Sequence, residues 1–289
     1  MPELPDLIVI RERLLPKLTD RKIEAIEIIE PVVVRNLLGT SIEEAFVGLT
    51  FRNLEQHGPF LNFDFAEKNI IIHPMLAGRF SLDSEYKKKD LCVRFSFNGL
   101  VLNYADDVRM GKVYFANQDQ IPRIPKYSDQ GIDLLSEEFT EDKFLSLIDK
   151  SRQQTRVFLM DQAKLSALGN AYSDEILFSA GIHPKTKCYQ LSVEDKKRLY
   201  RSIKEVLDYS IDYIRKKEAP LDFKVRDHVK VRNRKNEPCP RCGAKIRRAN
   251  VLGYDSFFCP VCQPLDGEQF IHWKLAEQRS EDGRRKTDD

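Results

Sequence analysis

The sequence lacks several features that would place a protein in a specialised class. Its 289 residues carry 47 Lys and Arg against 45 Asp and Glu, so the net charge is only +2. No apolar run approaches the roughly 20 residues that a membrane-spanning helix needs, and the amino-terminal segment lacks the basic start and apolar core of a secretory signal. Hydrophobic residues make up 42% and charged residues 32%, as in globular proteins. We therefore expect a cytoplasmic protein of about two domains, with no membrane partner.

Cysteine is also scarce, and its placement is informative. Of six cysteines, Cys92 and Cys188 lie in apolar contexts typical of buried free thiols, which indicates a reducing compartment. The other four follow the spacing C-x2-C-x16-C-x2-C, which is typical of a tetrahedral zinc site built from two tight turns. The predicted cofactor is therefore one structural Zn²⁺, and its ligands are Cys239, Cys242, Cys259 and Cys262.

Positive charge is concentrated next to this zinc motif, although the chain as a whole is almost neutral. Between positions 230 and 248 there is a single acid, Glu237, and there are eight basic residues: Lys230, Arg232, Arg234, Lys235, Arg241, Lys245, Arg247 and Arg248. So many like charges repel each other unless a polyanion or solvent relieves them. The segment could be a purely structural zinc ribbon with a solvated face, but we favour a nucleic-acid partner.

The order of the predicted elements defines an α+β multidomain chain. A helix is expected over 6–18, and short β-branched or aromatic runs between 20 and 120 predict strands, with a hairpin turn at Asn98-Gly99. Beyond a linker at 121–135 the pattern turns helical, and the longest helix begins with Ser192 and Asp195 in a capping box. The predicted division is an amino-terminal β domain at 1–130, a helical domain at 131–225, a zinc finger at 226–264 and a disordered tail at 265–289.

The first residues, Met1-Pro2-Glu3-Leu4-Pro5-Asp6, offer a nucleophile and an acid side by side. Removal of a methionine before proline is expected, and it leaves a secondary amine with a pKa of about 8. Such an amine can attack C1′ of a sugar and form a Schiff base. Glu3 is placed to move protons during the reaction. Many proteins begin Met-Pro without such a role, so this motif alone would not identify a catalytic site.

Four motifs in order together resemble the formamidopyrimidine-DNA glycosylase / endonuclease VIII family of base-excision repair. They are PELPD at 2–6, LGNAYSDE at 168–175, LFSAGIHP at 177–184 and the zinc finger CxxCGxxI…CPxCQ at 239–263. The resemblance covers the chain up to Gln263. It implies an amino-terminal β-sandwich with a flanking helix, a helix–two-turns–helix domain and a zinc-finger β-hairpin. It also implies that Pro2 and Glu3 are catalytic and that DNA binds between the lobes.

The resemblance also implies which residues contact DNA. Asn170 follows a glycine and opens a helix, so its amide and the nearby backbone N–H groups are expected to hold a phosphate. Excision from a duplex requires base flipping, and wedge side chains then fill the gap. The positions implied for the wedge are Leu76, Arg109 and Met110, with Arg109 facing the orphaned base. An N-cap without a ligand and ordinary hairpin tips are the alternative readings of these four positions.

The chain departs from the family where the family uses charge to grip DNA. Pro59 stands where a phosphate-binding lysine is usual, and proline offers neither charge nor N–H. The neighbouring His57 is expected to compensate in part. Tyr254 stands where the finger hairpin usually offers an arginine, and it can donate only one neutral hydrogen bond. Asp255 beside it adds a negative charge, and Val108 replaces the arginine beside Arg109.

Three functional hypotheses follow. The first is a monomeric, nucleoid-associated bifunctional glycosylase and β/δ-lyase acting through Pro2 on damaged bases. Its substrate range is expected to be shifted towards abasic sites, single-stranded or open DNA, or unusual lesions. The second is a non-catalytic protein that binds damaged DNA on the same fold. It is favoured by the missing lysine and arginine and disfavoured by Pro2 and Glu3. The third, a zinc-ribbon RNA-binding or translation factor, leaves PELPD unexplained.

Overall fold

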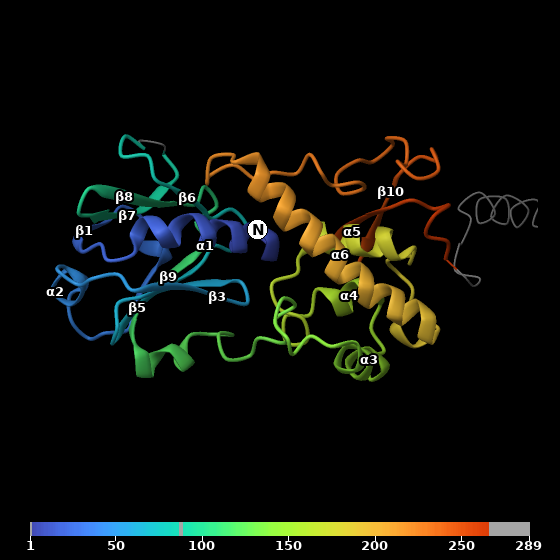
Figure 1. The fold of residues 1–289 in the computed structure, drawn as a ribbon, viewed down its shortest axis with the longest axis horizontal. Coiled ribbons are helices and arrows are strands. Elements are labelled where there is room, and N and C mark those ends of the chain that lie inside the picture. Colours follow the sequence, from blue (N-terminus) through green and yellow to red (C-terminus); the bar gives the residue numbers. More distant parts are fainter. Residues whose placement is uncertain (1, 87–88, 266–289) are drawn as a thin grey trace, which may run out of the picture.

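Two antiparallel-rich sheets form the amino-terminal lobe of the computed structural model, which describes residues 2–86 and 89–265. They face each other on the left of Figure 1. The four-stranded sheet has the order β1-β7-β8-β6, with β1 Ile23–Ile28, β7 Leu91–Phe97, β8 Leu100–Ala105 and β6 Arg79–Ser81. The five-stranded sheet has the order β2-β9-β5-β4-β3, with β2 Val34–Asn36, β9 Lys112–Asn117, β5 Lys68–His73, β4 Phe60–Asp64 and β3 Asn53–His57.

Phenylalanine side chains fill the space between the two sheets. Phe95 of one sheet and Phe115 of the other lie with their ring centroids 6.5 Å apart, and Phe46 meets Phe115 edge-on at 5.4 Å. Phe46 ends the short helix α2, Ile42–Phe46, which covers one end of the sandwich. Residues on the inner faces alternate with outward residues along β7, as expected for a strand with one buried face.

Helix α1, Leu4–Leu18, carries the amino terminus to the boundary between the lobes (Figure 1). Five of its buried residues recur every three or four positions and so share one face: Leu4, Leu7, Ile10, Leu14 and Leu18. This face joins a single hydrophobic core that runs from the sandwich into the helical lobe. The start of the chain is therefore fixed against both lobes.

The second lobe is helical, with η2 Gln118–Arg123 in the connection that leads to it. Its helices are α3 Glu141–Asp149, α4 Thr155–Leu159, α5 Asn170–Ala180 and α6 Val193–Lys217, and the turn η3 Cys188–Gln190 lies between α5 and α6. The turn η1 Pro31–Val33 belongs to the amino-terminal lobe. The long α6 crosses from this lobe back to α1 (Figure 1), where Arg215 pairs with Glu12 at 2.9 Å. A two-stranded hairpin, β10 Arg247–Val251 and β11 Tyr254–Phe258, packs against α5.

The architecture confirms the predicted fold class. Gly99 has a φ of +75° in the β7–β8 turn, as the Asn98-Gly99 signal requires. The Ser192 side chain accepts the backbone N–H of Asp195 at 3.1 Å, so the capping box of α6 is also confirmed. The first helix begins at Leu4 rather than at residue 6, with Glu3 as its N-cap residue. The Asp6 carboxylate accepts the N–H of Glu3 at 2.8 Å, which stabilises this start of the helix. Strand β3 is polar and was not predicted.

Two expectations lie outside the described residues. They are the removal of Met1 and, apart from residue 265, the disordered tail at 265–289. Among the helices that the structure describes, none combines the length and apolar character needed to cross a membrane.

Candidate active site and DNA interface

The Glu3 side chain connects the start of the chain to the start of α5. Its carboxylate accepts three backbone N–H groups, from Gly169 at 3.0 Å, Ala171 at 2.9 Å and Tyr172 at 3.1 Å. A Cβ on Gly169 would lie 2.6 Å from the Glu3 carboxyl carbon, so this position has no room for a side chain. The glycine of the LGNAYSDE motif is therefore explained by the close approach of Glu3.

The environment of Glu3 suits a proton-transfer group. The side chain is buried, and burial raises the pKa of its carboxyl above the ordinary value. The backbone N–H groups of Ala171 and Tyr172 lower the pKa in part, because they favour the charged form. The protonated form of this carboxyl therefore persists to higher pH than that of an exposed glutamate, which suits a group that donates a proton.

Arg226 fixes the backbone around Pro2 and Glu3 from the segment that follows α6. Its guanidinium donates to both oxygens of Asp6, at 2.8 and 2.6 Å, while Asp6 also accepts the N–H of Glu3. The Arg226 guanidinium lies over the Tyr172 ring at 5.4 Å. Pro2 is buried in this arrangement and lines a small cavity of about 40 Å³ with Asp6. Arg226 was not predicted from the sequence, because nothing local links it to Asp6, 220 positions away.

A cleft of about 430 Å³ opens beside Glu3. Its walls come from both lobes and carry more positive than negative charge; the lining residues are Glu3, Leu76, Asn170, Ala171, Lys224, Arg226, Val229, Arg232, Asn233, Arg234 and Glu237. Glu237 is paired with Arg234 at 3.0 Å, which offsets one acid with one base. The remaining cations make the cleft suitable for a polyanion.

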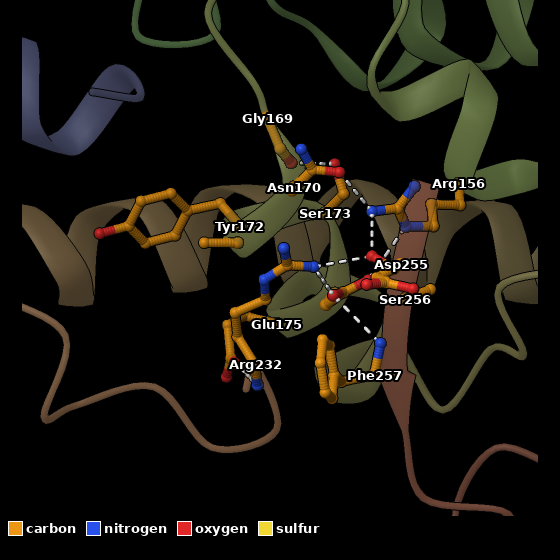
Figure 2. Close-up of polar contacts among 12 residues, drawn as sticks. Arg156, Gly169, Asn170, Tyr172, Ser173, Glu175, Arg232, Asp255, Ser256 and Phe257 are labelled. Carbon is orange, nitrogen blue, oxygen red and sulfur yellow. Dashed lines mark hydrogen bonds and ion pairs between the residues drawn. The ribbon is translucent and has the colours of Figure 1, made fainter. Parts of the chain in front are cut away.

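Asn170 lies in the wall of this cleft as the first residue of α5. Its side-chain oxygen accepts a hydrogen bond from Arg156 at 2.7 Å, so its NH₂ group is the remaining donor (Figure 2). The expectation that nearby backbone N–H groups hold a phosphate stays a prediction, and it would require some of them to leave Glu3. Those of Gly169, Ala171 and Tyr172 are already bonded to Glu3, and three N–H groups cannot serve both carboxylate and phosphate.

The three residues expected to form the wedge differ in their surroundings. Leu76 is 50% exposed and lines the cleft, and Met110 is 41% exposed at the β8–β9 turn. Arg109 has a φ of +56°, and its guanidinium pairs with Glu30 at 2.6 Å. The assignment of these three residues to a wedge stays a prediction, and Arg109 has to leave Glu30 before it can face a base.

His57 is held by the segment between the lobes. Its Nε2 lies 2.8 Å from the carbonyl oxygen of Tyr127, and the two rings stack with centroids 4.4 Å apart. Pro59 is buried in the adjoining turn between β3 and β4. The compensation expected from His57 therefore stays a prediction that would require its ring to exchange this contact for a phosphate.

The four predicted zinc ligands come together in the finger. Their sulfur atoms all lie within 4.8 Å of one another, and the Sγ atoms of Cys239 and Cys262 are 3.8 Å apart. Tetrahedral Zn–S bonds of about 2.3 Å place sulfurs about 3.8 Å apart, so four thiolates in this arrangement fit Zn²⁺. Gln263 ties the finger to the helical lobe, because its side chain accepts the N–H of Cys259 and donates to the carbonyl of Ile182.

Tyr254 lies at the exposed tip of the finger hairpin, where its side chain is 55% exposed. The charge of the neighbouring Asp255 is offset by Arg248, at 3.3 Å on the facing strand. Asp255 therefore repels DNA less than the sequence alone suggests. The role of Tyr254 in DNA binding stays a prediction.

Two buried acids that the sequence analysis did not single out hold the finger against α5. Asp174 accepts hydrogen bonds from Arg156, Arg232, Ser256 and the N–H of Phe257. Glu175 accepts the backbone N–H groups of 230–232 at 2.7 to 2.9 Å. Both belong to the LGNAYSDE motif. Their signal was a pair of adjacent acids in a mostly apolar helix, which is unusual unless they are paired.

Comparison with known proteins agrees with this geometry. Three family models match: the formamidopyrimidine-DNA glycosylase N-terminal domain at residues 1–113, the H2TH domain of that glycosylase at 130–218, and the zinc finger found in FPG and IleRS at 236–265. The formamidopyrimidine-DNA glycosylase of Lactococcus lactis is 31% identical over 274 residues, covering 91% of this chain and 99% of the relative. That of Geobacillus kaustophilus is 30% identical over 278 residues, covering 91% and 100%.

Solved structures of the Lactococcus lactis enzyme share the fold. A complex with DNA containing N7-benzyl-Fapy-dG superposes with a TM-score of 0.82 at 28% identity, covering 91% of this chain and 100% of that one. A complex with abasic-site DNA has a TM-score of 0.81 at the same identity and coverage. The chain belongs to the formamidopyrimidine-DNA glycosylase family. The predicted class of enzyme, a DNA glycosylase and AP lyase with a structural zinc and damaged DNA as partner, is confirmed at this level.

Proposed function

We propose that the protein excises damaged bases from DNA and cleaves the resulting abasic site through a Schiff base on Pro2. The observation that carries this proposal is the buried Glu3 carboxyl, which follows Pro2 in the chain, lines the cationic cleft and is held by three N–H groups at the start of α5. Binding alone would need neither a proline amine nor a buried acid beside it.

The roles follow from the chemistry of the two groups. The Pro2 nitrogen attacks C1′ of the sugar and the bond from C1′ to the base breaks, so that the base leaves with the proton that the attacking amine gives up. The lone pair of the nitrogen then forms an iminium with C1′ as the bond from C1′ to the ring oxygen breaks. Protonated Glu3 donates its proton to the sugar ring oxygen as the ring opens. Loss of a C2′ proton then permits β-elimination of the 3′ phosphate. A second elimination releases the 5′ phosphate, and water hydrolyses the iminium to free Pro2.

The substrate range is the finer part of the proposal. Relatives bind Fapy-dG and abasic DNA in their solved complexes, and we extend oxidised or ring-opened purines and abasic sites to this chain. Pro59 and Tyr254 remove two charged contacts, each worth about 1.5–3 kcal/mol where present. Binding of lesions in open or already distorted DNA depends least on these charged contacts, so the substrate preference is expected to shift towards abasic sites. We place the protein in the cytoplasm, associated with the nucleoid, as a monomer.

The alternative is a non-catalytic protein that binds damaged DNA, and the missing charges at positions 59 and 254 favour it. A single-turnover assay separates the two. Enzyme in excess is mixed with duplexes carrying either 8-oxoguanine or an abasic site, and strand cleavage is followed on denaturing gels. Cleavage of both duplexes to δ-elimination ends supports the enzyme, and faster cleavage of the abasic duplex supports the shifted range. Tight binding without cleavage of either duplex would establish the alternative.

A further inference from the structure

The buried carboxylate of Asp174 is shared by two arginines. Arg156 donates to it from Nε at 3.0 Å and Arg232 from Nη1 at 2.8 Å. The Asp174 and Arg156 side chains are fully buried, whereas that of Arg232 is 17% exposed and lines the cleft. One carboxylate cannot neutralise two guanidinium groups. Because burying an uncompensated charge is costly, the excess positive charge is accommodated where Arg232 reaches the cleft.

The Arg232 guanidinium presents a free edge. Nη1 donates to Asp174 and to the backbone carbonyl of Asp255, both at 2.8 Å. Within 2–86 and 89–265, Nε and Nη2 have no hydrogen-bond partner, and Figure 2 shows them on the side opposite Asp255. The Phe257 ring packs against the guanidinium at 5.1 Å and fixes its plane. The Nε/Nη2 edge is the fork that matches two phosphate oxygens.

Asn170 is coupled to Arg232 through Arg156. Nη2 of Arg156 donates to the Asn170 side-chain oxygen at 2.7 Å and to the Asp255 carbonyl at 2.9 Å, and that carbonyl also accepts from Arg232. Three consecutive hydrogen bonds therefore join Asn170 to Arg232 (Figure 2). Both residues line the same cleft, and both have their remaining donors unused by the described residues.

We propose that Arg232 binds a backbone phosphate of the DNA through its Nε/Nη2 edge, beside the amide of Asn170. Arg232 thereby supplies a positive charge that the finger hairpin lacks at Tyr254. It does so from the loop between α6 and the first zinc ligand, Cys239. This inference rests on the proposed function, since it assigns a contact to the DNA of that reaction. The buried Asp174–Arg156 pair acts as the support that holds both donors in place.

The test is the salt dependence of binding to a short duplex that contains a tetrahydrofuran abasic analogue. Arg232→Gln removes the charge, and Arg232→Lys keeps a cation that can pair with Asp174 but lacks the fork. The matched control is Arg201→Gln, which removes an exposed arginine paired with Glu194 on α6 and outside the cleft. Thermal unfolding and zinc content of each variant are measured alongside.

For Arg232→Gln we expect binding weakened about 10- to 100-fold and a slope of log affinity against log salt that is shallower by about 1. For Arg232→Lys we expect a smaller loss with the wild-type slope, and for Arg201→Gln no change. A purely structural Arg232 would lower thermal stability and leave the slope unchanged, and that result overturns the inference. If Arg232→Gln does not fold, wild-type affinity of Arg232→Lys overturns it.

The same experiment separates this inference from the proposed function. Wild-type protein is also tested for cleavage of a natural abasic duplex. If the wild type binds the analogue but does not cleave the abasic duplex, the proposed function fails, and the contact of Arg232 is still judged from the binding of its variants. If the wild type cleaves and the Arg232 variants bind with wild-type affinity and slope, only the contact is wrong.

Discussion

At the scale of single residues, Glu3 is the point where the amino terminus, α5 and the cleft meet. Its carboxylate takes the N–H groups that would otherwise remain unpaired at the start of α5, which also places a negative charge at the positive end of a helix. The same side chain faces the cleft. One residue therefore caps a helix and joins the lobes, and in the proposed reaction it also transfers a proton.

Replacing Glu3→Gln should separate these roles, because glutamine still accepts hydrogen bonds but cannot donate a proton as an acid. Base release from 8-oxoguanine DNA should slow by about 10²–10⁴-fold. Burial raises the pKa of the wild-type carboxyl, so the protonated form persists to higher pH than for an exposed glutamate. Wild-type excision should therefore decline as pH rises through this raised pKa, and the variant should lose that limb. The measurement is single-turnover excision across pH.

A Glu3→Gln protein that excises the base at the wild-type rate, with the same pH profile, would contradict the role given to Glu3. Cleavage of a preformed abasic duplex is the internal control. It needs no base release and should be affected less.

At the scale of elements, the contact between α5 and the finger depends on Asp174. Replacing Asp174→Asn leaves Arg156 and Arg232 without a counter-charge in a buried setting. We expect a loss of about 3–5 kcal/mol in the free energy of unfolding, as for other broken buried ion pairs. The measurement is urea denaturation followed by circular dichroism. Glu194→Gln, which breaks an exposed pair with Arg201, should cost about 1 kcal/mol or less.

Equal losses of stability for Asp174→Asn and Glu194→Gln would mean that the buried network does not hold the finger. The ion pairs of Asp174 would then contribute no more to the free energy of unfolding than an exposed ion pair does.

The finger itself depends on metal, because β10 and β11 form only a two-stranded hairpin, which is marginal on its own. Removing zinc with a chelator should unfold the finger and weaken DNA binding strongly, while most of the helix and sheet signal is retained. The measurements are zinc release, circular dichroism and binding to an abasic-analogue duplex. DNA affinity that survives complete zinc release would contradict this view of the finger.

How far the sequence predicts the structure depends on the separation of the interacting residues. The Asn98-Gly99 pair, the Ser192 capping box and the cysteine spacing are local signals. The turn, the helix start and the cysteine cluster that they predict are all confirmed. Strand β3 was missed, because its polar residues carry no clear alternation and it is stabilised by pairing with β4. The ion pair of Arg109 with Glu30 joins residues 79 positions apart, so no local sequence pattern could predict it.

The same reasoning applies to the candidate site. The motifs indicated Pro2, Glu3 and Asn170, but not what they contact. That Glu3 occupies the N–H groups around Asn170 depends on the packing of two elements 166 to 169 positions apart. Arg226 was not predicted, and Arg232 was recognised only as one of the basic residues beside the zinc motif. Their partners, Asp6 and Asp174, are brought to them by the fold and not by any local pattern.

At the scale of the whole molecule, one hydrophobic core runs through both lobes and carries α1 between them. This core fixes the start of the chain at the boundary of the lobes (Figure 1), where Glu3 contacts the start of α5 and lines the cationic cleft. The positive charge that makes the cleft attractive to DNA comes from residues 224–234, between α6 and the first zinc ligand, and not from the sandwich. In the proposed reaction, these parts act together to form a covalent intermediate on Pro2.

Borohydride trapping detects this intermediate, because it reduces the iminium to a stable crosslink. The purified protein is incubated with duplexes carrying 8-oxoguanine or an abasic site in the presence of borohydride, and mass spectrometry locates the adduct and determines whether Met1 has been removed. We predict a reduced crosslink on Pro2 with both duplexes, formed more efficiently with the abasic site. No crosslink with either duplex, from protein shown to begin at Pro2, would contradict the catalytic account and leave a protein that only binds damaged DNA.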